Sequence, residues 1–311
     1  MLITLWLALK KSALRFLSVN AIKFSASLSY YTIFALPPML LIVFGITGFF
    51  YGEEAIQGKV YGQISGIVGS SVAMQIEHFI QNIHLSGGSV FATTASIITL
   101  IFSSTAIFAE IQDSINIIWR IKARPRKEWL KWLKNRLLSF SMIVTLGFLL
   151  LVSLVISTLL DLLLARLQYI LVGIPIQLFF VLNFALVFSV ITFLFAIIFK
   201  FLPDGFVKWK DALRGASFTA ILFMIGKFLI GFYLNNSSLT SIYGAVESVI
   251  IILLWVYYSS IILYFGAIFT LVYANLYGSK IFPKEYAVFI RQEEIEYTGS
   301  TKKQAGAESL G

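Results

Sequence analysis

One lysine lies inside a long apolar stretch, and its position makes it the first candidate for chemistry. Lys227 falls within the apolar run 212–234, where a charge in a membrane span is costly and is usually paired or functional. Lys227 could bind an anionic group of a substrate, or take part in a proton-coupled step with Glu247. The structural alternative is a side chain that reaches toward the outer surface, with Asp161 or Glu247 as its partner.

Two carboxylates form a second candidate site. Glu110 and Asp113 are three residues apart at the end of another apolar run, a spacing that places them on one face of a helix. Such a pair could guard the cytoplasmic entrance to a cation or proton path. The alternative is ion pairing with the basic residues that follow in the segment 120–136.

The sequence has few other residues that could bind a metal or act in catalysis. The chain has no cysteine and two histidines, so there is no disulfide, thiolate metal site or cysteine nucleophile. His78 and His84 are six residues apart, which does not suit a shared metal on one helix face. The sequence also contains no glycine-rich loop of the phosphate-binding type. We therefore expect no metal, no cofactor and no catalytic residue, and we predict that the protein is not an enzyme.

The elements that position these residues are predicted from composition. Hydrophobic residues make up 59% of the 311 residues and charged residues 13%, and the mean hydropathy is +0.88. These values indicate an all-α polytopic membrane protein. Six apolar runs are long enough to be spans. They are residues 25–50, 91–111, 137–160, 174–198, 212–234 and 249–271.

The remaining segments complete a single membrane domain over residues 1–277. The segment 1–23 has apolar residues at helical spacing between basic ones, which predicts an interfacial helix. The loop 51–90 has the pattern of a short external amphipathic helix. Residues 278–311 are predicted to be a polar cytoplasmic tail that is disordered at its end.

Basic residues predict the orientation. Of the 24 Lys and Arg residues, 21 lie in the segments 1–23, 120–136, 200–214 and 278–311, all on one side of a six-span arrangement. The positive-inside rule makes that side cytoplasmic and places both termini there. The loop 120–136 is then expected to contact anionic lipid headgroups. An RNA-binding patch is the less favoured interpretation, so nucleic acid is not an expected partner.

The first predicted span contains a proline pair near its centre. Pro37 and Pro38 remove two backbone donors and disfavour helical geometry at the preceding residue, so we expect a kink or break near mid-bilayer. Discontinuous helices at that depth often form substrate sites. Tyr30 and Tyr31 would then lie in the inner half of the helix, as wall residues of a cavity.

Three stretches together resemble the YihY/BrkB family of bacterial inner-membrane proteins. They are SLSYYTIFALPPMLLIV at 27–43, FAEIQDSINIIW at 108–119, and the run from FKFLPD at 199 to Ala274. The resemblance implies a six-helix fold in the bacterial cytoplasmic membrane. The family has carried the labels ribonuclease BN and virulence factor, without agreed catalytic residues. One departure is Asn20 and Lys23, where members often have an acidic residue.

These observations favour a transporter or lipid-handling protein with a site near the proline-broken first helix. The alternative is a non-enzymatic membrane scaffold for envelope assembly, with the loop 51–90 or 120–136 as its contact surface. An RNA-cleaving enzyme is a distant third. The substrate, the coupling ion, the partner proteins and the oligomeric state do not follow from the sequence.

Overall fold

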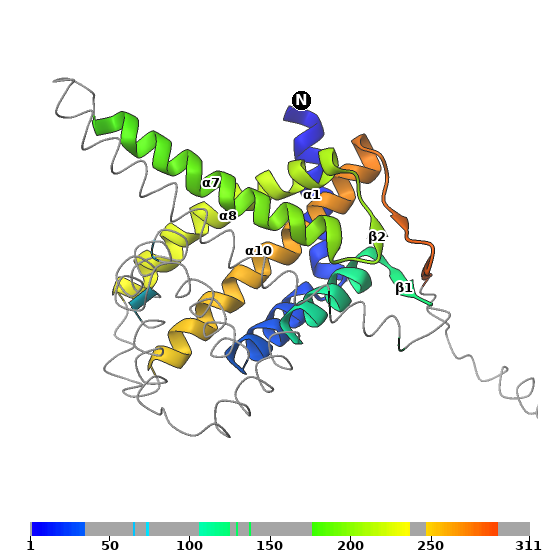
Figure 1. Ribbon diagram of the computed structural model, residues 1–311, viewed down its shortest axis with the longest axis horizontal. Coiled ribbons are helices and arrows are strands. Elements are labelled where there is room, and N and C mark those ends of the chain that lie inside the picture. Colours follow the sequence, from blue (N-terminus) through cyan, green and yellow to red (C-terminus); the bar gives the residue numbers. More distant parts are fainter. Residues whose placement is uncertain are drawn as a thin grey trace, which may run out of the picture.

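The computed structural model describes residues 2–34, 65, 73–74, 106–124, 129, 137, 176–236 and 247–291. Figure 1 shows that these parts are mostly helical. The helices are α1 (Leu2–Ser18), α7 (Ile176–Phe201), α8 (Trp209–Asn236) and α10 (Glu247–Tyr277), together with the helical residues 21–34 and 106–119. The strands are β1 (Ile121–Ala123), β2 (Gly205–Phe206), β3 (Phe282–Pro283) and β4 (Ala287–Phe289).

Three of the described helices are long and apolar enough to cross a membrane. Their candidate spans are Phe184–Phe201, Trp209–Tyr233 and Val249–Tyr277, which match the last three runs predicted from the sequence. The helical residues 21–34 and 106–119 coincide with the beginning of the first predicted run and the end of the second. Of the third run only Leu137 is described, and of the loop 51–90 only Ser65, Ala73 and Met74, so the proposed external helix lies outside the described residues.

The interface between α8 and α10 is built on two reciprocal glycine and threonine pairs. A β-carbon placed on Gly215 of α8 would lie 1.9 Å from Oγ1 of Thr270 on α10, and one on Gly266 of α10 would lie 2.0 Å from Oγ1 of Thr219 on α8. Each threonine hydroxyl donates to a carbonyl four residues earlier, at 2.7 Å in both cases. Small residues thus bring the two backbones together, as is usual between membrane helices.

Aromatic side chains fill the space where α7 meets α8 and α10. The ring of Phe195 on α7 lies 5.9 Å from that of Phe223 on α8, and Phe223 in turn lies 5.9 Å from Trp255 on α10, both edge to face. Ala216 and Ala220, which have the small-residue spacing expected for close packing, are fully buried. These aromatic contacts pack α7 against α8 and α8 against α10.

The N-terminal helix packs against α10 instead of lying wholly apart from the bundle. Ala8 and Ser12 of α1 are fully buried, and the ring of Phe16 lies 5.8 Å from that of Phe265. The helix ends before Asn20, which has a positive φ of 54°, and a second helix begins at residue 21. The helix α1 also exposes large apolar side chains. These are Leu5, Trp6, Leu7, Leu14 and Leu17.

Two short antiparallel ladders lie where α7 ends and α8 begins (Figure 1). β1 pairs with β4, with Lys122 opposite Val288, and β2 pairs with β3, with Gly205 opposite Pro283. The chain after α10 is therefore folded onto the bundle as far as residue 290, which the expectation of a polar tail over 278–311 did not anticipate. The reason is that strands of two or three residues carry too little alternation to be recognised.

Candidate functional site

A buried aspartate joins three distant parts of the chain at the end of the bundle that carries the two β-ladders. Asp204, in the turn after α7, is 1% exposed. Its Oδ1 accepts a hydrogen bond from Gln112 Nε2 at 3.2 Å, and its Oδ2 accepts one from Asn116 Nδ2 at 2.9 Å. The Asp204 backbone N–H donates to Asn116 Oδ1 at 2.8 Å. The carboxylate is thus satisfied by side chains one turn apart on the helix 106–119.

The C-terminal segment closes over the same aspartate. The backbone N–H of Lys284 donates to the Asp204 carbonyl at 2.8 Å, and the Lys284 ammonium donates to the Pro203 carbonyl at 2.7 Å. Burial, the charge of Asp204 and a hydrogen bond to its carboxylate raise the pKa of Tyr286 well above its ordinary value. The Tyr286 hydroxyl therefore stays neutral. It holds the chain just before β4 against Asp204.

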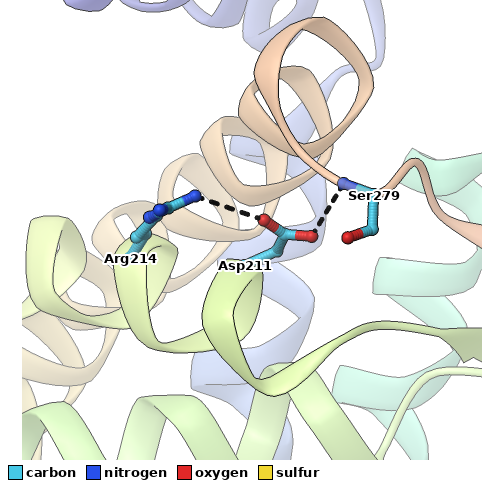
Figure 2. A network of polar contacts seen from close by, with 3 residues as sticks. All are labelled: Asp211, Arg214 and Ser279. Carbon is cyan, nitrogen blue, oxygen red and sulfur yellow. Dashed lines mark hydrogen bonds and ion pairs between the residues drawn. The ribbon is translucent and has the colours of Figure 1, made fainter.

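A second carboxylate joins the beginning of α8 to the end of α10. Figure 2 shows Asp211 between Arg214 and Ser279: Oδ2 accepts from the Ser279 backbone N–H at 3.0 Å, and Oδ1 lies 3.8 Å from the Arg214 guanidinium. Asp211 is in the first turn of α8, where a negative charge is favourable. Gly278 leaves room for it, because a β-carbon there would lie 2.5 Å from Asp211 Oδ1.

The helix 106–119 carries a further polar cluster on the side that faces α10. Ser114 Oγ lies 3.5 Å from Glu110 Oε1. Tyr264 on α10 is fully buried, and Ser114 and Glu110 are the polar groups that act on its hydroxyl. Asp113, in contrast, is on an exposed part of the helix. The structure therefore places the two carboxylates of the predicted gate in different surroundings.

A groove lies between α7 and α8, toward the end opposite the Asp204 turn. Its volume is about 310 Å³, and apolar side chains make up nearly all of its wall. Lys227 is half-buried on α8, directly before Phe228, one of the residues of the wall. An apolar groove of this kind suits a hydrocarbon chain more than a polar solute. The lining residues are Phe184, Phe188, Ile221, Met224, Ile225 and Phe228.

The remaining predicted site residues lie only partly within the described structure. Glu247 is the first residue of α10, whereas Asp161, Pro37 and Pro38 lie outside the described residues. Tyr30 and Tyr31 are on the helix 21–34, and both are exposed, with Tyr30 packed edge to face on Phe34 at 5.1 Å. Their proposed role as cavity walls stays a prediction.

Sequence reasoning missed the Asp204 cluster. The segment Pro203, Asp204 and Gly205 has the composition of an ordinary surface turn, and nothing local indicates that its carboxylate is buried. A signal was present elsewhere: Gln112 and Asn116 are amides four residues apart in a largely apolar helix, a spacing that places them on one face. Two such amides predict a buried polar partner.

Comparisons with known proteins place the chain among membrane proteins. The family model described as Virulence factor BrkB matches residues 13–286. The chain is 28% identical over 266 residues to a UPF0761 membrane protein of Stenotrophomonas maltophilia strain K279a, covering 81% of this chain and 57% of the relative. It is 30% identical over 275 residues to a UPF0761 membrane protein of Pseudomonas paraeruginosa, covering 86% and 62%.

The chain thus spans about three fifths of the length of these curated relatives. No solved structure matches it. The resemblance to the YihY/BrkB family inferred from the three sequence stretches is confirmed by the family match.

Proposed function

This chain belongs to the BrkB family of membrane proteins, and from that premise we propose that it handles an anionic amphiphile within the bilayer. The observation that carries the proposal is the apolar groove between α7 and α8 with Lys227 in the same stretch of α8. An acyl chain would lie in the groove, and Lys227 would bind the anionic group at its end. The amphiphile is a substrate, and no catalytic residue is assigned.

The position of the groove along the helices supports this assignment. Phe228 is 19 residues into α8, about 29 Å from its beginning at 1.5 Å per residue. The turn at the beginning of α8 carries the Lys and Arg residues of the segment 200–214. If this turn is cytoplasmic, the groove opens toward the outer leaflet. Lys227 would then be placed at the depth where lipid headgroups meet acyl chains.

The proposal includes a topology of six spans in the bacterial cytoplasmic membrane, with both termini inside. The absence of native cysteine makes it testable without background. A Lys208→Cys variant in intact cells is expected to resist a membrane-impermeant maleimide, and Lys59→Cys is expected to react. Reaction of Lys208→Cys as fast as Lys59→Cys would overturn the orientation.

The function is tested by flux in proteoliposomes. We expect the purified protein to move a fluorescent anionic phospholipid between leaflets faster than its zwitterionic counterpart. Lys227→Met is expected to slow anionic movement about tenfold or more, equivalent to about 1.4 kcal/mol from one lost charged contact. Leu229→Met, at an exposed position nearby, is the matched control. Equal rates for wild type and protein-free vesicles would contradict a transport function.

A further inference from the structure

Four aromatic side chains lie exposed where α7 ends and α8 begins, and we call them the aromatic patch. The ring of Phe201 lies 5.6 Å from that of Trp209, edge to face. Phe206 is the cross-strand partner of Phe282 in the β2–β3 ladder, and side chains at paired positions lie on the same face. Each of the four residues is between 42% and 55% exposed. Contiguous apolar groups that stay exposed mark sites of interaction with a membrane or another molecule.

The ammonium of Lys200 joins the two parts of the aromatic patch. It lies 4.8 Å from the centre of the Phe206 ring and 5.9 Å from that of the Trp209 ring, and it donates to the Val207 carbonyl. One cation at the end of α7 is thus held by two rings and a carbonyl. These contacts orient the rings of β2 and of the first turn of α8 toward each other.

The exposed charges beside the aromatic patch are mostly positive. Lys208 and Lys210, next to the patch in the chain, are both exposed. Asp204 and Asp211 are only 1% and 3% exposed, and their carboxylates accept hydrogen bonds from within the protein. Glu285, after β3, is an exposed carboxylate nearby in the chain. The surface therefore has an excess of positive charge, which suits an anionic partner.

Exposed rings between exposed lysines fit one layer of a membrane. The candidate span Phe184–Phe201 ends at the patch, and the span Trp209–Tyr233 begins there. Aromatic rings that face water lose the free energy gained by burial, whereas lysines in the hydrocarbon core are costly. The headgroup layer satisfies both, because it offers apolar contact to the rings and water and phosphate to the ammonium groups.

We propose that the aromatic patch, together with Lys208 and Lys210, is a binding site for the headgroups of anionic phospholipids. The rings contact the glycerol and upper acyl groups, and the two ammonium groups bind headgroup phosphates. Lys200 is a positioning residue, since two rings and a carbonyl already hold its ammonium. The site is about 29 Å along α8 from Phe228, at 1.5 Å per residue, and it does not depend on the proposed function of the groove.

The site is tested with brominated phospholipids in vesicles that contain the purified full-length protein. A bimane label on Leu213→Cys reports on the lipids at the patch, because Leu213 is one turn after Trp209 and 41% exposed, and the chain has no native cysteine. Vesicles contain equal amounts of phosphatidylglycerol and phosphatidylcholine, with the bromine on one or the other. We expect quenching to show a preference for phosphatidylglycerol of about fivefold or more, the equivalent of about 1 kcal/mol from one lysine near an anionic surface.

Two substitutions of lysine carry the comparison. Lys208→Gln with Lys210→Gln should lower the preference for phosphatidylglycerol about fivefold or more. Lys10→Gln with Lys11→Gln removes two exposed charges from α1, and this matched control should keep the preference. Phe206→Gln with Phe282→Gln should also lower it, because the lysines lose the rings that hold them at headgroup depth.

Each contrary outcome is specific to this site. Equal quenching by the two lipids without further substitution would overturn it, and so would a preference that survives the loss of Lys208 and Lys210. An equal loss in the α1 control would show that net charge alone sets the preference, which also overturns the site. Quenching by neither lipid would mean that lipid does not contact the patch, with the same consequence. If the double variant does not fold, Lys208→Gln and Lys210→Gln are compared singly, each with a smaller expected loss.

Discussion

Asn116 and Asp204 exchange hydrogen bonds in both directions across 88 residues of sequence. The amide of Asn116 donates to the Asp204 carboxylate at 2.9 Å, and the Asp204 backbone N–H donates back to the Asn116 oxygen at 2.8 Å. Both residues are buried. This pair fixes the end of the helix 106–119 to the turn between α7 and α8.

Replacing Asn116 with alanine should destabilise the protein. The substitution removes one hydrogen bond to the buried Asp204 carboxylate and the acceptor of the buried Asp204 N–H, and an unsatisfied buried N–H costs roughly 1–3 kcal/mol. Denaturant or thermal unfolding in detergent measures the loss. Ile117→Val on the same helix is at an exposed position and should change the free energy of unfolding by less than about 0.5 kcal/mol. Equal stability of Asn116→Ala and the wild type would show that the pair contributes nothing.

The glycine and threonine interface makes a second prediction. Gly215→Ala should destabilise the protein by about 1–3 kcal/mol, because the new methyl group meets Thr270 on α10. Gly231→Ala is the matched control, since a β-carbon there meets nothing within 4 Å, and it should be neutral or stabilising by up to about 1 kcal/mol.

A double substitution tests the cause of that loss. Adding Thr270→Ala to Gly215→Ala removes the side chain that the methyl group meets, so part of the lost stability should return. A double variant whose stability is the simple sum of the two single losses would argue against direct contact.

Tyr286 predicts a dependence of stability on alkaline pH. Its pKa is raised in the folded protein by burial, by the charge of Asp204 and by their hydrogen bond, so the folded state holds the proton more tightly than the unfolded state. The contribution of Tyr286 to the stability of the folded protein is complete below about pH 10, the pKa of an unperturbed tyrosine. This contribution is lost as the pH rises above that value. The pH profile of unfolding of Tyr286→Phe should therefore fall less steeply above pH 10 than that of the wild type. Parallel profiles would contradict this.

The helices α7, α8 and α10 could be predicted because long apolar runs are a strong signal. Their ends were less accurate. The apolar run 212–234 omits Trp209 and Asp211, which begin α8, because polar residues in a first helical turn resemble a loop. α10 continues to Tyr277, beyond the run that ends at 271.

Of the candidate sites, some could be predicted from the sequence and others could not. Lys227 stands out because one charge in an apolar helix is visible in sequence alone, and the structure shows it half-buried on α8. Asp204 could not be found, because its burial depends on Gln112, Asn116 and the strand β4 segment, which reach it from far along the chain. The groove between α7 and α8 depends on the register of two helices, which hydropathy does not define.

The central claim is that Lys227 and the groove bind one anionic amphiphile, and photo-cross-linking tests it most directly. A phosphatidylglycerol with a diazirine in its acyl chain should label peptides containing Phe188 and Ile225, more strongly than the same chain on phosphatidylcholine. Ile225→Trp, which fills the groove, should abolish the labelling, and Lys227→Met should remove the headgroup preference; Leu229→Trp should change neither. Equal labelling of both lipids in the wild type, or full labelling of Ile225→Trp, would contradict the claim.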